Sequence, residues 1–207
     1  MRLQHRFRLS LTALACAMAL GAPSLALAVP SVGSPAPQFT ATTTDGKPVG
    51  LADYAGKLVV LEWTNKDCPF VRKHYSSGNM QSVQAAVARQ GGVWLSIISS
   101  APGKQGHIKP EEANAVAKDE AAVVNGIVID EAGTIGHLYG ASATPHMYVI
   151  DAKQTLRYMG AIDDRPSANT SSLNGASNYV LAAVDSIKAG REVAVKETAA
   201  YGCSVKY

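Results

Sequence analysis

Residues 58–75 read LVVLEWTNKDCPFVRKHY and set one cysteine between a predicted strand and a predicted helix. The run at 58–61 predicts a buried strand, because it is short, apolar and rich in β-branched residues. Pro69 predicts the start of a helix, since proline is favoured at the first helical position. Cys68 would therefore lie just ahead of a helix N-terminus, where free N–H groups and the helix dipole favour negative charge.

We interpret Cys68 as a reactive thiol that solvent can reach. The thiolate is the nucleophilic form of cysteine, and the helix terminus together with Lys66, Arg72 and Lys73 is expected to lower the thiol pKa. Neighbouring carboxylates act in the opposite direction. The alternative is a buried structural cysteine, which is the usual state of an unpaired one.

The first 28 residues have the pattern of a secretory signal peptide. Arg2, Arg6 and Arg8 precede an apolar run at 11–20, and a small-residue cleavage site ends at Ala28. The run is too short to span a bilayer, so we expect export to the periplasm or the extracellular space without stable membrane insertion. Retention of the segment as a membrane anchor is the alternative.

Charge and length limit the class of binding partner and the number of domains. The chain has 207 residues with 19 Lys and Arg against 16 Asp and Glu, and three of those cations but none of the anions lie in the predicted leader. The mature chain is then electrically balanced, and we expect no nucleic-acid partner. Its length fits one compact domain at 29–190, which leaves a tail at 191–207.

The number and spacing of the cysteines limit which disulfides and metal sites can form. Of the three cysteines, only Cys68 and Cys203 lie outside the leader. An exported compartment is oxidising, so a disulfide between these two residues is one expectation. The sequence contains no Cys-x-x-Cys pair of the kind that binds metal through thiolates, and we expect no metal and no cofactor.

The order of predicted elements indicates the fold class. An N-terminal β-hairpin turns at Asp45-Gly46, strands and helices then alternate, and a second hairpin precedes a last helix capped by Ser177. This order predicts an α/β fold with a mixed central sheet flanked by helices. The predicted elements are strands 38–44, 48–51, 57–63, 93–99, 126–129, 147–150 and 155–162, and helices 69–90 (weakened at 77–79), 110–123, 131–139 and 178–189.

Several motifs resemble the alkyl-hydroperoxide-reductase/thiol-specific-antioxidant (redoxin) branch of the thioredoxin superfamily. The tail at 202–207 is similar to the Gly-Cys-Ser-Ile-Lys-aromatic ending of peroxiredoxin-like thioredoxin-fold proteins. The resemblance covers roughly residues 33–187 and implies a thioredoxin-like fold. The entry motifs are G-x-x-A-P-x-F at 33–39, D-G-K at 45–47 and L-x-D-Y-x-G-K at 51–57.

Departures from the family patterns separate its branches. A thioredoxin carries Cys-x-x-Cys, whereas the second cysteine position here is Val71. A peroxiredoxin carries Pro-x-x-x-Thr-x-x-Cys, whereas the first two positions here are Leu61 and Asn65. The segment from which a peroxiredoxin brings an Arg to the thiolate is Ala-Thr-Pro-His at 143–146, which resembles the cis-proline turn of thioredoxin.

The resemblance implies a substrate-binding surface beside the thiol. Pro145 would follow a cis peptide bond and face Cys68, with Thr144 in the same turn, and Pro69 and Phe70 would complete the surface. An ordinary trans turn at Pro145 is the alternative.

Two residues are candidates to act with Cys68. Glu62 has the spacing of the thioredoxin core carboxylate, which handles the thiol proton, and burial in a strand would raise its pKa. A solvent-facing Glu62 is the alternative. Cys203 would be the resolving thiol, which attacks a sulfenic acid or a mixed disulfide at Cys68. Its alternatives are an unpaired surface thiol and a structural bridge.

Three functions follow from these residues. The first is an exported thiol–disulfide oxidoreductase that acts on a protein or small-molecule thiol or disulfide with an unidentified electron donor. The second is a peroxidase in which peroxide oxidises Cys68 to a sulfenic acid. The third is a non-catalytic binding domain with a structural Cys68–Cys203 bridge.

Overall fold

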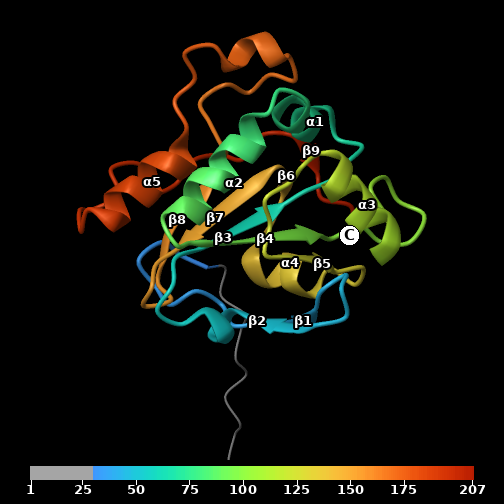
Figure 1. The fold of residues 1–207 in the computed structure, drawn as a ribbon, viewed down its shortest axis with the longest axis horizontal. Helices are drawn as coiled ribbons and strands as arrows, with labels where there is room; N and C mark the ends of the chain where they lie inside the picture. The colour runs from blue at the N-terminus through green and yellow to red at the C-terminus, as the bar shows by residue number, and fades with distance from the viewer. Residues whose placement is uncertain (1–29) are drawn as a thin grey trace, which may run out of the picture.

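A five-stranded mixed sheet forms the centre of residues 30–207, which the computed structural model describes (Figure 1). The signal peptide predicted at 1–28 lies outside the described residues. The strand order is β5-β4-β3-β7-β8, in which β3, β4 and β5 are parallel and β7 is antiparallel to both of its neighbours. The strands are β3 (Val59–Trp63), β4 (Val93–Ile98), β5 (Gly126–Ile129), β7 (His146–Ile150) and β8 (Leu156–Gly160). The predicted mixed-sheet α/β architecture is confirmed.

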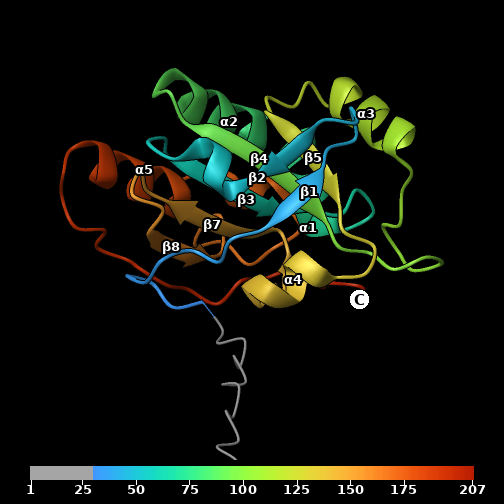
Figure 2. The same cartoon turned by 90° about the horizontal axis from the view of Figure 1, so that it is seen from below.

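The predicted N-terminal hairpin forms a separate two-stranded sheet. In it β1 (Thr40–Thr42) pairs antiparallel with β2 (Pro48–Gly50), and a 3-10 helix, η1 (Leu51–Tyr54), follows. Gly46 in the turn has a φ of +76°, a conformation that glycine adopts without strain. Figure 2 shows this hairpin and α4 in front of the sheet, on one and the same face.

Helices cover both faces of the sheet. In Figure 1 α2 and α5 lie on the side opposite to α4 and the hairpin. A buried cluster that includes Val60, Met80 and Val184 fills the space between the sheet and the helices on the α2 side. The helices are α1 (Pro69–Ser76), α2 (Asn79–Arg89), α3 (Pro110–Asp119), α4 (Thr134–Tyr139), η2 (Thr170–Leu173) and α5 (Tyr179–Lys188).

The helix predicted at 69–90 is broken where its sequence is weakest. Gly78 has a φ of +75° and separates α1 from α2, as the Ser-Gly-Asn segment predicts. The predicted cap of the last helix is wrong by one residue. Asn178, rather than Ser177, is the N-cap of α5, because its side chain accepts a hydrogen bond of 2.9 Å from the Leu181 N–H.

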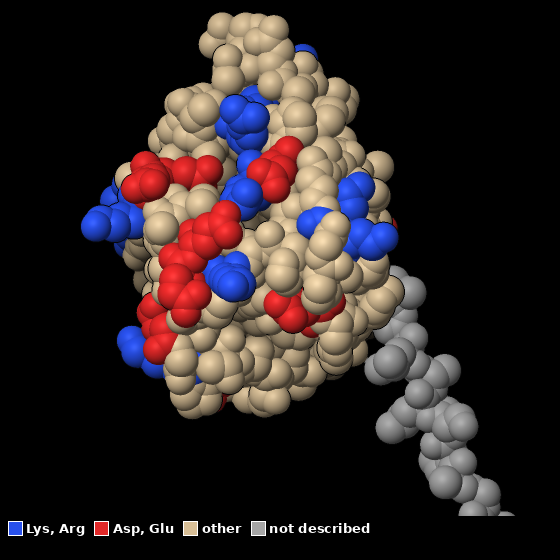
Figure 3. Space-filling view, turned by 90° about the vertical axis from the view of Figure 1, so that its right-hand side faces the viewer, with Lys and Arg blue, Asp and Glu red and all other residues tan. Residues whose placement is uncertain are grey.

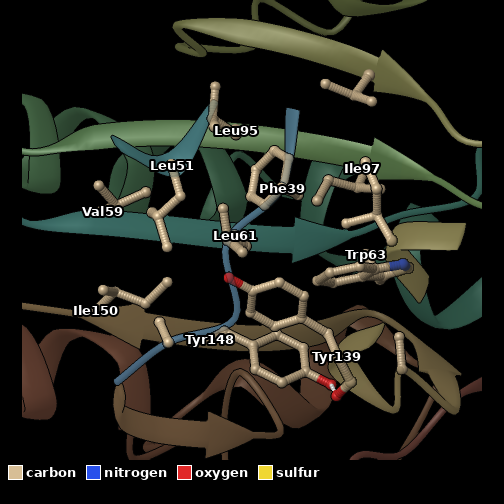
Figure 4. Packing of buried hydrophobic residues seen from close by; sticks show 14 of the residues in the cluster. Phe39, Leu51, Val59, Leu61, Trp63, Leu95, Ile97, Tyr139, Tyr148 and Ile150 are labelled. Atoms are coloured by element: carbon tan, nitrogen blue, oxygen red, sulfur yellow. Dashed lines mark hydrogen bonds between the residues drawn. The ribbon is translucent and has the colours of Figure 1, made fainter. Parts of the chain in front are cut away.

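An aromatic group closes the core on the hairpin side of the sheet (Figure 4). The Trp63 ring at the end of β3 lies 5.4 Å from the Tyr139 ring and 5.1 Å from the Tyr148 ring. Its indole N–H donates to the Ser99 hydroxyl at 3.0 Å, so its single polar atom is paired. This packing fixes the carboxyl end of β3, from which the chain runs directly to Cys68.

Within residues 30–207, every helix is too short or too polar to cross a bilayer.

Candidate active site

Cys68 lies at the point where the β3–α1 connection turns into the helix. It is the N-cap of α1, Pro69 follows at the first helical position, and the Cys68 N–H donates to the Asn65 carbonyl at 3.0 Å. The Asn65 side chain accepts a hydrogen bond from the Asp67 N–H at 2.9 Å, and this bond stabilises the turn before Cys68. The local arrangement matches the one predicted from the strand–Cys–Pro order.

The C-terminal tail crosses directly over this thiol. Two short strands, β6 (Ala143–Thr144) and β9 (Cys203–Ser204), pair antiparallel with Thr144 opposite Cys203. The Cys203 N–H donates to the Cys68 sulfur with a distance of 3.4 Å between nitrogen and sulfur. Both cysteines are free thiols in the structure. Figure 1 shows β9 beside β6 and α1, although the tail and α1 are far apart in the sequence.

Glycine allows this close approach. Gly202 has a φ of +144°, and a Cβ atom there would lie 1.9 Å from the Thr144 carbonyl oxygen. No side chain fits in that space, so residue 202 must be glycine for β9 to reach β6.

The Cys68 thiol has no exposed surface, so the prediction that solvent can reach it is wrong for this conformation. Burial acts to raise the pKa of the Cys68 thiol, but hydrogen bonds from the Cys203 thiol, the Thr144 side chain and the backbone N–H groups of Val71 and Cys203 outweigh it and lower the pKa. One contact favours the neutral form, because the thiol donates to the Thr144 carbonyl at 3.1 Å.

The cations expected to stabilise the thiolate are engaged elsewhere. Lys66 pairs with Asp67 at 3.0 Å, and the Lys73 ammonium donates to the Arg165 carbonyl at 2.9 Å. Hydrogen bonds therefore account for the lowered pKa of Cys68, and the prediction that flanking cations lower it is wrong for these two lysines.

The pKa values of the two thiols are shifted in opposite directions. Burial, the hydrogen bond with Cys68 and the charge of Cys68 raise the pKa of the Cys203 thiol to about 11. When one proton is lost from the pair, the thiolate is therefore expected on Cys68 while Cys203 keeps its proton.

Glu62 is fully buried on β3 and does not face solvent. Its carboxylate accepts from the Tyr75 hydroxyl at 3.0 Å, the Trp94 indole N–H at 2.9 Å and the Ser96 hydroxyl at 3.3 Å. Burial raises the pKa of Glu62, against the lowering effect of these donors. None of its hydrogen bonds joins it to Cys68, so a proton would have to pass between the two groups through an intermediary.

A second carboxylate lies near Glu62. Burial and the charge of Glu62 raise the pKa of Glu120 to about 7. Glu120 and Tyr75 line a small, mostly apolar cavity of about 40 Å³ between α3 and the sheet. A proton on Glu120 therefore titrates near neutral pH.

The predicted substrate-binding turn is already occupied by the chain itself. The Thr144–Pro145 peptide bond is cis, as the resemblance implies, and both residues are buried. Thr144 pairs with Cys203 of β9, so the backbone of this turn is already hydrogen-bonded within the chain. Pro69 is exposed, and the half-buried Phe70 ring packs on the Tyr201 ring at 5.9 Å.

A buried polar cluster next to the thiol was not predicted. The Tyr201 hydroxyl donates to Asp163 and contacts the Lys73 ammonium at 3.1 Å and the His74 ring at 3.3 Å. Burial lowers the pKa of Lys73, and burial together with the charge of Lys73 lowers the pKa of His74 to about 4. Lys73 was expected to support the thiolate, yet it is 1% exposed and its ammonium is held within this cluster. Its partners come from distant segments, so no local pattern could have identified the cluster.

The described residues contain no cluster of metal ligands. Among residues 30–207, no three His, Cys, Asp or Glu side chains are grouped closely enough to bind a metal ion. On the face in Figure 3, which carries α3 and the C-terminal end, adjoining acidic side chains form a stripe with basic side chains beside it.

Comparisons with known proteins bear on the family and the fold. The model of the AhpC/TSA family matches residues 32–159. The search of curated proteins found no match. An uncharacterized conserved protein from Geobacillus kaustophilus is 25% identical, with a TM-score of 0.72 and coverage of 91% of this chain and 98% of that one.

Other solved structures share the fold. A hypothetical protein from Sinorhizobium meliloti 1021 is 23% identical with a TM-score of 0.71, over 86% of this chain and 94% of that one. A candidate thiol:disulfide interchange protein, DsbE, from Chlorobium tepidum is 22% identical with a TM-score of 0.52, over 63% of this chain and 84% of that one. These two likenesses bear on the fold alone.

Proposed function

The chain belongs to the AhpC/TSA (redoxin) family of thioredoxin-like proteins, and on that premise we propose that it is a thiol–disulfide oxidoreductase whose working pair is Cys68 and Cys203. Family membership makes it a thiol-based redox protein. The observation that carries the finer proposal is the hydrogen bond of 3.4 Å from the Cys203 N–H to the Cys68 sulfur. It brings together two thiols that lie 135 residues apart in the sequence.

The proposed reaction alternates between a dithiol and a Cys68–Cys203 disulfide. The lowered pKa of Cys68 supplies a thiolate, and thiolate is the form that takes part in thiol–disulfide exchange. Glu62 is the proposed proton acceptor for this cycle, acting at a distance. The proposed substrate is a protein or small-molecule thiol or disulfide, and the electron donor is a separate thiol protein or a low-molecular-weight thiol.

We also propose that the chain works outside the cytoplasm after removal of residues 1–28. An oxidising compartment would favour the disulfide state of the pair. Cell fractionation, with the N-terminal residue of the isolated protein determined, tests this point. A mature chain that begins at Val29 supports it, and full-length protein in the cytoplasm contradicts it.

A peroxidase is the competing function, and the family match supports it as well. Within residues 30–207, no Arg or Lys side chain hydrogen-bonds to the Cys68 sulfur, so the thiolate lacks the cation that would polarise a peroxide. The thiol–disulfide proposal therefore has the stronger support.

One experiment separates these functions. The mature chain, Cys68→Ser and Cys203→Ser are each assayed for exchange with a disulfide-bonded peptide and for peroxide consumption with a thiol present. We expect exchange in the wild type, loss of turnover in both variants, and little peroxide consumption. Rapid peroxide consumption that requires only Cys68 would establish the peroxidase instead. No activity in either assay, with a bridge that resists mild reductant, would favour the binding domain.

A further inference from the structure

Only one thiol of the proposed pair reaches the surface. Cys68 is completely buried, whereas Cys203 is partly exposed. The Cys68 sulfur contacts the Cys203 N–H of β9 at 3.4 Å and the Thr144 carbonyl of the paired strand β6 at 3.1 Å. Disulfide exchange requires access to the sulfur that is attacked. A protein thiol therefore meets Cys203 first.

The C-terminal tail, which covers Cys68, is held by hydrogen bonds upstream of Cys203. The Thr198 N–H donates to the Met159 carbonyl at 3.1 Å, and its hydroxyl accepts from the Ala161 N–H at 2.9 Å. Three residues later, Tyr201 is anchored in the buried cluster with Asp163 and Lys73.

The tail is anchored downstream of the cysteine as well. The Tyr207 hydroxyl donates to the Ala141 carbonyl at 2.6 Å, and its ring stacks on His137 at 3.9 Å. The Lys206 carbonyl accepts from the Ala101 N–H at 2.8 Å. All of these hydrogen bonds must break before the whole tail can lift and expose Cys68, so that opening is unfavourable.

We propose that external dithiols exchange with this protein at the sulfur of Cys203. Cys68 stays buried and is the leaving group when the Cys68–Cys203 bond breaks and the attacking group when that bond forms again. The inference rests on the proposed function. It also reverses the roles expected from the sequence, in which Cys68 attacks the substrate and Cys203 only resolves. The substrate class is a dithiol that the protein oxidises.

The chemistry of the two sulfurs supports this direction. Hydrogen bonds lower the pKa of Cys68, and a thiol of lower pKa is the better leaving group. Stabilisation of that thiolate favours the reduced form of the protein, which makes its disulfide more oxidising.

Each step balances in bonds and electrons. A substrate thiolate attacks the Cys203 sulfur, a new sulfur–sulfur bond forms, the Cys68–Cys203 bond breaks, and the electron pair leaves on Cys68. The second substrate thiolate then attacks the substrate sulfur of the mixed disulfide. The substrate disulfide forms, and Cys203 leaves as a thiolate that takes a proton from water. Two substrate thiols have then been oxidised and one protein disulfide reduced, and a second, more oxidising disulfide restores the protein by the reverse steps.

Single-thiol variants of the mature chain test the proposal. Cys68→Ser keeps only Cys203, and Cys203→Ser keeps only Cys68 beneath an intact tail. Each is mixed with glutathione disulfide over a range of pH, and mixed-disulfide formation is followed by intact mass. Comparison of the plateau rates at high pH removes the difference in ionisation. A third variant, Cys203→Ser with Gly202→Ala, forces β9 away from Thr144 and uncovers Cys68.

We expect the chain with only Cys203 to form the mixed disulfide at least about tenfold faster than the chain with only Cys68, and the third variant to recover the rate at Cys68. Faster capture by Cys68 beneath the intact tail would overturn the inference and leave the proposed function standing. Equal rates at Cys68 with and without Gly202→Ala would also overturn it, because the tail would then not be the cover. Failure of the wild-type chain to close any Cys68–Cys203 bridge would instead remove the proposed function.

Discussion

Replacing Gly202 with alanine should uncouple the two thiols without changing either sulfur. A Cβ atom at this position would lie 1.9 Å from the Thr144 oxygen and 2.7 Å from its carbonyl carbon. Both are backbone atoms, which cannot rotate away. The φ of +144° adds strain, because side-chain-bearing residues rarely adopt it. β9 must therefore move away from β6, and Cys203 moves with it.

The size of the effect follows from the strain. A residue forced into such a conformation costs about 1–3 kcal/mol, and we take about 2 kcal/mol as the loss from the closed tail. That loss lowers the equilibrium constant for closing the Cys68–Cys203 disulfide about 30-fold. Gly175→Ala is the matched control, since Gly175 also has a positive φ, of +68°, but nothing lies within 4 Å of its Cβ position.

The assay is equilibration with glutathione redox buffers, followed by acid quenching, alkylation and intact-mass measurement. Far-UV circular dichroism verifies that each variant is folded. We expect a shift in Gly202→Ala and none in Gly175→Ala. An equilibrium constant in Gly202→Ala within twofold of the wild type would refute the close approach of β9 to β6.

Four further changes probe other contacts of the site. Tyr201→Phe removes the hydroxyl bonded to Asp163 and should weaken disulfide closure severalfold in the same redox titration, whereas an unchanged value would exclude a positioning role. Gly136→Ala places a Cβ 2.5 Å from the Tyr207 ring and should speed proteolysis of the C-terminal tail; wild-type cleavage rates would contradict this. Glu62→Gln should slow thiol–disulfide turnover while unfolding remains cooperative, and equal turnover would remove its proton-transfer role. The folded pKa of Glu120, about 7, exceeds its unfolded value, so the folded chain holds this proton longer and loses stability as pH rises from about 4.5 to about 7. In urea unfolding, Glu120→Gln should therefore gain stability relative to the wild type across that range, and a constant difference would show that Glu120 does not titrate as described.

Local patterns in the sequence were sufficient for the framework of the site. The apolar run before Cys68 and Pro69 after it predict a strand and a helix, and both form where expected. Gly78 breaks the long helix because it adopts a positive φ that its neighbours would resist. These features depend on residues close together in the chain, which is why they could be predicted.

The environment of the thiol depends on contacts that the sequence does not reveal. Lys73 looks like a surface cation on a short helix, yet Asp163 and Tyr201 enclose it after the chain has crossed the sheet several times. Cys203 lies in a polar tail without a strong pattern, and its strand forms only because the backbone of Ala143–Thr144 is free to pair with it. The burial of Cys68 follows from that pairing, so exposure was the natural but wrong prediction.

The redox pair itself is tested most directly by the mass of the mature chain after oxidation with glutathione disulfide. The chain should become lighter by two hydrogen atoms, and digestion without reductant should yield one peptide pair that joins Cys68 to Cys203. A chain that keeps both thiols under these conditions, or that links Cys203 only to a second molecule, would contradict the account.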